Sequence, residues 1–210
     1  MSARLIYVMD PMCSWCWGFA PVASALIDQA NQAGVPTHLV VGGLRSGSAA
    51  LDGATRKYIL EHWQAVAETT GQLFNFEGAM PDGFVYDTEP ACRALVAARE
   101  LDGERLWPLL AAIQSAFYEG AHDVTTAPHL VELAEQAGFE RGLFAESFTR
   151  AETRAATAAD FAWAQGLGIA GFPTLLAERN GQLALLTNGY QPLERLQPLL
   201  GRWLQQAASA

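Results

Sequence analysis

The stretch DPMCSWCWGFAP, residues 10–21, holds two of the three cysteines of this 210-residue chain, Cys13 and Cys16. It follows a short apolar run rich in strand formers, 5–9, and opens a segment, 14–33, with apolar residues at helical spacing. A cysteine at a helix start lies beside unpaired backbone N–H groups, which favour its thiolate and lower its pKa. The second cysteine, three residues on, shares that face and can close a disulfide. The pattern therefore indicates a redox-active pair.

The order of predicted elements places this pair inside a strand–helix–strand unit. A second strand pattern at 37–41 completes βαβ in about 40 residues. From about residue 52 to 166 almost every segment is typical of a helix, with predicted spans of 58–69, 89–101, 105–118, 127–136 and 149–167. Strand patterns return at 174–177 and 183–187 on either side of Asn180-Gly181, a hairpin signal, and a last amphipathic helix spans 193–206.

Three other interpretations of the cysteine pair stay open at this point. A zinc site would need two more ligands, and only Cys92 and four scattered histidines remain. The pair would otherwise be two ordinary buried cysteines, or a permanent disulfide, which is uncommon in a reducing compartment. A Cys-x-x-Cys that follows a strand inside a βαβ unit favours redox chemistry over these three.

A second stretch, GIAGFPTLL at residues 168–176, places Pro173 at the start of a predicted strand, where proline is tolerated. Together with Cys13-Ser14-Trp15-Cys16 after the first strand and the long helical segment between them, this makes the chain resemble the DsbA-like branch of the thioredoxin superfamily. A weaker resemblance, to the insertion of FrnE-type members, lies between residues 118 and 134.

This resemblance covers nearly the whole chain and implies an α/β, thioredoxin-like fold (βαβ…ββα) with a large all-helical insertion. The first part of the thioredoxin-like domain would span 1–50, the helical insertion domain 51–166, and the second part 167–210. It also implies a thiol–disulfide oxidoreductase or isomerase of the protein-disulfide type, acting through the Cys-Ser-Trp-Cys site. The implied catalytic residues are Cys13 as nucleophile, Cys16 as resolving thiol and Pro173 as a cis-proline, and the Phe172 backbone is implied to pair with an extended substrate. The substrate-binding residues expected are Trp15, Phe172 and Thr174, with the alternative that Trp15 only covers the helix start.

The resemblance implies no metal and no cofactor, apart from glutathione as an optional co-substrate. The partners expected are protein or small-molecule thiol and disulfide substrates and a redox partner. Acidic residues outnumber basic ones, 22 against 13, for a formal charge of −9, which argues against nucleic-acid binding. No apolar run is long enough for a membrane span, and residues 1–10 lack a signal-peptide core. We therefore expect no membrane association and a cytoplasmic location.

The chain departs from its presumed relatives inside the motif. The periplasmic oxidants carry a histidine between the cysteines that helps to stabilise the thiolate, whereas this pair encloses Ser14 and Trp15. Asp10 adds a negative charge that opposes thiol ionisation if it lies close, so we expect a less oxidising disulfide. Glutathione-dependent isomerases and transferases of the kappa-class/hydroxychromene-carboxylate isomerase type usually have serine at the position of Cys13. They remain the alternative function.

Other residues carry weaker signals. Cys92, on a predicted helix, fits a buried core position better than a third redox thiol. Arg45, in a glycine-rich loop after the second strand, is a minor candidate for an anion contact, and no histidine is assigned a catalytic role. Trp17 is expected to be more packed than Trp15. The aromatic residues of the loop before Thr88 would either line a pocket above the cysteines or join the core: Phe74, Phe76, Phe84 and Tyr86.

Overall fold

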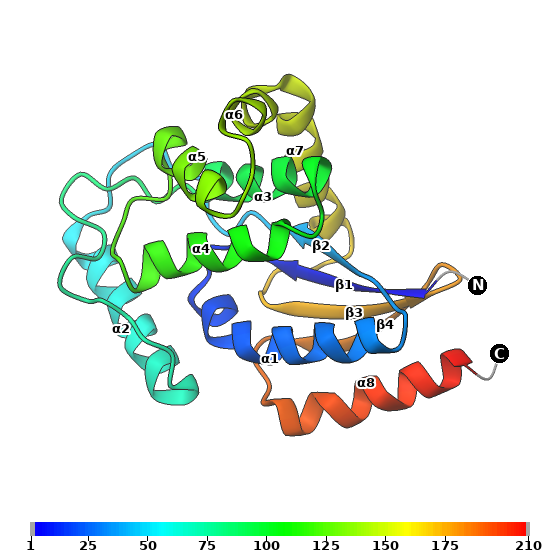
Figure 1. Ribbon diagram of the computed structural model, residues 1–210. Coiled ribbons are helices and arrows are strands. Elements are labelled where there is room, and N and C mark those ends of the chain that lie inside the picture. The colour runs from blue at the N-terminus through cyan, green and yellow to red at the C-terminus, as the bar shows by residue number, and fades with distance from the viewer. Residues whose placement is uncertain (1–2, 209–210) are drawn as a thin grey trace.

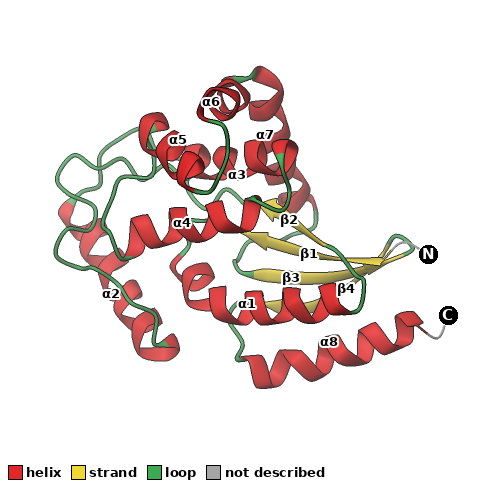
Figure 2. Cartoon of the chain, viewed as in Figure 1, coloured by secondary structure: helices red, strands yellow, loops and turns green. Residues whose placement is uncertain are grey.

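The computed structural model describes residues 3–208, which form four strands and eight helices (Figures 1 and 2). The strands are β1 (Ala3–Met9), β2 (Thr37–Val41), β3 (Thr174–Arg179) and β4 (Gln182–Asn188). The helices are α1 (Ser14–Gln32), α2 (Gly53–Thr70), α3 (Glu89–Leu101), α4 (Leu106–Tyr118), α5 (Ala127–Gln136), α6 (Arg141–Thr149), α7 (Ala151–Gly166) and α8 (Leu193–Ala208).

The strands form one mixed sheet in the order β2-β1-β3-β4. Strand β1 pairs parallel with β2 and antiparallel with β3, and β4 closes the sheet antiparallel to β3. Tyr7 on β1 therefore lies between Leu39 on β2 and Leu175 on β3, although these partners are far apart in the sequence. The two ends of the chain share a single sheet, and the predicted thioredoxin-like fold is confirmed.

Alternating side chains of β1 divide the core between the two faces of the sheet, because strand residues point to opposite sides in turn. Leu5, Tyr7 and Met9 join the large core that includes residues of α1 and α8, whereas Ile6 and Val8 pack with a smaller cluster that includes Ala164 of α7. Figure 1 shows α1 and α8 side by side along one face of the sheet, with α3 and α7 on the far side of β2. The sheet is thus enclosed at its centre, where the N-terminal motif begins.

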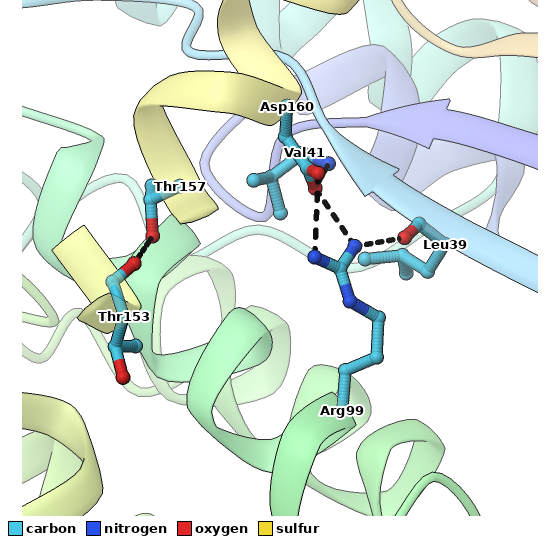
Figure 3. A network of polar contacts seen from close by, with 6 residues as sticks. All are labelled: Leu39, Val41, Arg99, Thr153, Thr157 and Asp160. Carbon is cyan, nitrogen blue, oxygen red and sulfur yellow. Dashed lines mark hydrogen bonds and ion pairs between the residues drawn. The ribbon is translucent and has the colours of Figure 1, made fainter. Parts of the chain in front are cut away.

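An ion pair fastens the helical segment to β2 (Figure 3). The Arg99 guanidinium on α3 contacts the Asp160 carboxylate on α7 at 2.8 Å and donates to the Leu39 carbonyl at 2.6 Å. The same carboxylate accepts from the Val41 N–H at 3.1 Å, on the outer edge of β2. Both charged side chains are less than one fifth exposed. Two helices therefore hold the strand that ends beside the cysteine motif.

The main error of the sequence analysis concerns residues 138–167. A single helix was expected over 149–167, but α6 ends at Thr149 and α7 begins at Ala151, because Arg150 is extended (φ −61°, ψ 146°). The Glu140 carboxylate caps α6 by accepting from two backbone N–H groups of its first turn. A glycine at position 142 weakens the helical pattern of α6, which explains why it was not predicted.

Candidate active site

Cys13 lies at the start of α1, directly after the turn that ends β1. Its N–H donates to the Asp10 carbonyl and its own carbonyl accepts from the Trp17 N–H, both at 3.1 Å, so Cys13 is the N-cap residue of α1. The N–H groups of the first helical turn, beside this residue, have no intrahelical acceptor. Cys13 is 5% exposed and Cys16, one turn further on, is fully buried. The sulfur nearer to the surface is therefore that of Cys13.

The two thiols of the motif differ in environment. All three cysteines of the described chain are free thiols, so the site is in its dithiol form. Burial raises the pKa of Cys16 well above its ordinary value and the interaction with Cys13 raises it further, while a hydrogen bond to the Asp10 backbone partly offsets these effects. A buried thiol that keeps its proton is poorly suited to attack an external disulfide. The arrangement favours Cys13 for the first attack.

The peptide bond between Phe172 and Pro173 is cis, as the sequence predicted. It lies against the cysteine pair, because the Cys13 thiol is 3.6 Å from the Phe172 carbonyl oxygen in a weak hydrogen bond. The Pro173 carbonyl accepts from the Gly189 N–H at 2.7 Å, which ties this loop to the end of β4. Two segments 159 residues apart thus meet at one sulfur.

The Phe172 ring is seated on the glycine pair that follows β2. A Cβ atom at Gly42 would lie only 2.0 Å from Cζ of this ring, and one at Gly43 would lie 2.9 Å from the Phe161 ring. The Gly42 N–H also donates to the Met9 carbonyl at 2.8 Å, so the glycine is held at the end of the sheet. These glycines provide the space that Phe172 needs in order to approach Cys13.

The two tryptophans of the motif have different surroundings. Trp15 is half-buried, lies beside the cavity next to Cys13 and tilts against Tyr190 with ring centroids 5.9 Å apart. Trp17 is 8% exposed, stacks on Tyr118 and donates through Nε1 to the Leu73 carbonyl at 3.0 Å. Trp17 is thus the more packed of the two, as expected, and a role of the more exposed Trp15 in substrate binding stays a prediction.

The Thr174 side chain is buried and its hydroxyl forms hydrogen bonds within the protein. Its side chain is 1% exposed, and its hydroxyl lies 2.9 Å from the Gly171 carbonyl and 3.1 Å from the Asn188 side chain. The backbone of Thr174 pairs with Val8 and Asn188 in the sheet. The hydroxyl therefore stabilises the loop that carries Pro173, and a role in substrate binding stays a prediction.

Asp10 is fully buried beneath the cysteine motif, and its carboxylate joins several loops by hydrogen bonds. Its carboxylate accepts from the N–H groups of Met12 (2.8 Å) and Leu44 (2.7 Å) and from the Thr88 hydroxyl (2.7 Å). The Cys92 thiol, also buried, lies 3.4 Å from the same carboxylate. Burial raises the pKa of Asp10, and these four donors partly offset that effect. Cys92 occupies the core position expected from the sequence, but its bond to Asp10 was not foreseen.

A cavity of about 300 Å³ opens beside Cys13, with Trp15 and Phe172 on its rim. Its polar lining includes Arg45 and the exposed His62, and the Arg45 guanidinium lies 5.0 Å from the centre of the Tyr86 ring. The Tyr86 hydroxyl donates to the Met12 carbonyl at 2.5 Å. A cavity of this size, with a cation and an imidazole near a thiol, suits a small anionic thiol compound.

The sequence analysis missed His62 and treated Arg45 as a minor candidate. Both come from segments outside the cysteine motif, and no spacing in the sequence connects them with Cys13. Of the four aromatic residues before Thr88, Tyr86 alone lines this cavity. The others pack in or against the core, around Trp63 and Phe117. Within residues 3–208, no three His, Cys, Asp or Glu side chains are grouped as a metal site requires.

Comparison with known proteins identifies the family. Residues 4–201 match the model of the DSBA-like thioredoxin domain, and the chain belongs to this family. No curated protein matches the sequence. In the described part of the chain, no helix has the length and apolar character needed to cross a membrane.

Several solved structures resemble this chain over nearly its whole length. The chain is 42% identical to a candidate protein disulfide isomerase from Nitrosomonas europaea, with a TM-score of 0.91 over 98% of this chain and 99% of that one. It is 31% identical to the cytosolic disulfide reductase DsbM from Pseudomonas aeruginosa, with a TM-score of 0.79 over 99% of this chain and 100% of that one. DsbM with GSH matches at 29% identity and a TM-score of 0.74, over 98% of each chain. A 2-hydroxychromene-2-carboxylate isomerase, 14% identical with a TM-score of 0.63 over 98% of each chain, shares the fold alone.

The fold and the relatives define the class of this protein as a DsbA-type thiol–disulfide oxidoreductase.

Proposed function

We propose that the protein exchanges disulfides through Cys13 and Cys16, with Cys13 as the attacking sulfur. The observation that carries this proposal is the position of Cys13 at the N-cap of α1, within 3.6 Å of the carbonyl that precedes the cis-proline. In the first step the Cys13 thiolate attacks a substrate disulfide and one substrate thiolate leaves. In the second step Cys16 attacks the Cys13 sulfur, which closes the Cys13–Cys16 disulfide and releases the second thiolate.

We propose that the loop before β3 binds the backbone of an extended substrate. Phe172 presents its backbone beside Cys13, and Pro173 has no N–H, so an extended substrate is free to pair with the Phe172 backbone. The half-buried Trp15 supplies an apolar surface beside the thiol. Thr174, whose backbone pairs within the sheet, holds the end of this loop in place. This arrangement accepts a peptide segment or a small disulfide.

Glutathione is the small thiol that we propose as co-substrate. Support comes from the cavity beside Cys13, where Arg45 and His62 can face the carboxylates of an anionic peptide. DsbM, which resembles this chain over its whole length, is known with GSH. Since the relative is described as a cytosolic disulfide reductase, we also propose a cytoplasmic location and a weakly oxidising disulfide for this chain.

The surroundings of the cysteine pair support a weakly oxidising disulfide. A strongly oxidising disulfide requires a stabilised reduced form, with a thiolate favoured by nearby cations or donors. Here burial, followed by the interaction with Cys13, raises the pKa of Cys16, whereas Asp10 acts in both directions: a hydrogen bond to its backbone lowers this pKa and its charge raises it. Ser14 and Trp15 bring no cation between the two cysteines.

Trapping of the mixed disulfide tests the proposed roles. Cys13→Ser should abolish exchange with oxidised glutathione, whereas Cys16→Ser should accumulate a glutathione adduct on Cys13, because attack survives and resolution does not. Mass spectrometry of the intact chain measures the adduct, and the variant Cys16→Ser/Cys92→Ala should still accumulate it, because Cys13 is then the only thiol that can carry it. Equal loss in both single variants without an adduct would refute the assignment.

The alternative, a glutathione-dependent isomerase or transferase, is favoured by the same cavity. In that reaction a bound glutathione thiol would be activated without cycling of the cysteine pair. Cys16→Ser separates the two functions, since it should stop turnover of an oxidoreductase and leave an isomerase active.

A further inference from the structure

The two edges of the sheet differ in how their backbone groups are satisfied. At β2 the Val41 N–H donates to the Asp160 carboxylate and the Leu39 carbonyl accepts from Arg99, so α3 and α7 serve that edge. Strand β4 lies at the opposite end of the strand order. It pairs with β3 on one side, and within residues 3–208 no strand pairs with its other side. The outer side of β4 therefore presents a row of backbone N–H and C=O groups.

The sequence of β4 lacks the residues that usually protect an exposed edge. Between Gln182 and Asn188 there is no Lys, Arg, Asp, Glu or Pro, which are the residues that natural proteins place there to discourage pairing. The pairing with β3 is irregular only at Leu186, where the register shifts by one residue. Residues 182–185, before this shift, are regularly paired and all exposed. This segment is thus a regular, uncharged strand that is open to a further strand.

One face of this segment is apolar. Leu185 is directly paired with Leu176, which is directly paired with Ile6, so the three side chains point to the same face of the sheet. Leu176 and Ile6 are buried there in the cluster that includes Ala164 of α7. Helix α7 packs over β2 (Figure 1), and Leu185 on the far strand is 63% exposed. Leu183, two residues earlier on the same face, is 42% exposed.

A groove of about 280 Å³ runs beside these two leucines. Leu167, which is 46% exposed, and Ile169 line its other side, directly after α7. Contiguous exposed apolar surface of this kind marks interaction sites on soluble proteins. The groove shares no lining residue with the cavity beside Cys13, so an occupant of the groove would leave the lining of that cavity unchanged.

The charges around β4 favour a second copy of this chain as the occupant. Each copy carries a formal charge of −9, which opposes self-association through most surfaces. At β4 the strand itself is uncharged, and Arg4 and Glu178, in the same cross-strand row as Leu183, neutralise each other in an ion pair at 2.6 Å. Two β4 strands can therefore meet without placing like charges opposite each other.

We propose that two copies of the chain pair through β4, antiparallel and about a two-fold axis at Ala184, into one continuous sheet of eight strands. A two-fold axis normal to the sheet keeps the same face of both copies on the same side. Ala184 then faces its counterpart, and Leu183 of each copy faces Leu185 of the second copy. The four leucines form one apolar row beside the two grooves, and the same patch serves both copies, as a two-fold interface requires.

The dimer has two measurable properties that follow from this geometry. An interface built on one short strand and a few side chains is small, so association should be weak and should depend on concentration. Salt screens the repulsion between two acidic chains, with a Debye length of about 8 Å at 0.15 M, so the dimer should strengthen as the salt concentration rises. An interface held by ion pairs would show the opposite dependence.

Sedimentation velocity of the reduced full chain, from about 5 µM to about 500 µM, tests the dimer. The parent should pass from monomer to dimer in this range. Leu185→Glu places a charge in the apolar row and should raise the midpoint concentration by about tenfold or more. Leu143→Glu is the matched control, because Leu143 on α6 is also exposed, at 59%, and it should leave the midpoint unchanged.

A double variant tests the register. In Leu183→Lys/Leu185→Glu the proposed pairing sets opposite charges against each other across the two copies, so part of the lost association should return. Leu185→Glu should also keep the parent rate of exchange with oxidised glutathione, because Leu185 does not line the Cys13 cavity, and this rate verifies that the variant is folded.

Three results overturn the proposal. The first is a parent that stays monomeric over the whole range, and the second is a dimer that Leu185→Glu does not weaken. The third is a double variant that associates no better than Leu185→Glu alone. If the parent is monomeric and Leu185→Glu slows reduction of an unfolded protein disulfide but not of oxidised glutathione, the patch binds substrate polypeptide and the dimer is refuted.

Discussion

Replacing Gly42 by alanine perturbs the site through one added methyl group. A Cβ there would lie 2.0 Å from Cζ and 2.1 Å from Cε1 of the Phe172 ring, whereas ordinary contacts begin near 3.4 Å. The ring must therefore move by about 1.5 Å, the difference between 2.0 Å and an ordinary contact of about 3.5 Å. Overpacking of this kind typically costs about 1–3 kcal/mol of unfolding free energy.

The displacement should also reach the active sulfur. The carbonyl of Phe172 lies 3.6 Å from Cys13 Sγ, and a misplacement of about 1 Å near reacting groups can slow a reaction by about 10²-fold. We therefore expect Gly42→Ala to lower stability in urea unfolding and to slow exchange with oxidised glutathione by about tenfold to a hundredfold. Gly53→Ala is the matched control, because a Cβ there meets nothing within 4 Å, and it should leave both properties unchanged or slightly improve stability.

A double variant shows whether the ring is the cause. Gly42→Ala combined with Phe172→Ala removes the clash, so its cost in stability should be smaller than the sum of the two single costs. Additive costs, or a Gly42→Ala protein with parent stability and parent exchange rate, would show that Phe172 is not seated on Gly42.

Two further predictions concern buried charges. Asp160→Ala should lower the unfolding free energy by about 3 kcal/mol, because it leaves the Arg99 charge without its carboxylate partner and the Val41 N–H without its acceptor. The double variant Arg99→Leu/Asp160→Leu should lose less, as measured by urea unfolding. Burial raises the pKa of Asp10, so its contribution to stability is full below about pH 4 and is lost as the pH rises through the raised pKa. Asp10→Asn should therefore remove part of the fall in stability above pH 4, and a parent-like pH slope in this variant would contradict the charged, buried carboxylate.

Much of the fold could be predicted from local patterns. The predicted spans 37–41, 89–101 and 127–136 match β2, α3 and α5 residue for residue, because each has clear periodicity and clear ends. The Asn180-Gly181 turn has positive φ at both positions, 51° and 80°, which is the backbone that this dipeptide favours between two strands. The break at Arg150 could not be predicted in this way, because a single extended residue does not interrupt the apolar pattern of the two helices around it.

The site could be predicted only where its residues share a motif. Cys13, Cys16 and Pro173 were predicted from the Cys-x-x-Cys spacing and from the Gly-Phe-Pro-Thr stretch that makes the chain resemble its family, and the structure brings these two segments together, while their catalytic roles stay a prediction. Tyr7 was read as one apolar residue in a buried strand, and its hydroxyl carries no signal in the sequence. Its place in the core with α1 follows from the packing of α1 on β1.

Asp10 shows most clearly why the motif alone does not determine the chemistry. Its donors come from three segments, at Met12, Leu44 and the pair Thr88 and Cys92, and the last two lie about 80 residues away in the chain. Through them a single carboxylate holds the turn before Cys13, the loop after β2 and the start of α3 in one arrangement. The hydrogen bonds from these partners lower the pKa of Asp10 and so favour its charged form. A chain with the same four-residue motif but without these partners would lack that effect beside its buried thiol. The helical segment between β2 and β3 therefore contributes to the surroundings of the cysteine pair, because its Thr88 and Cys92 side chains contact the Asp10 carboxylate.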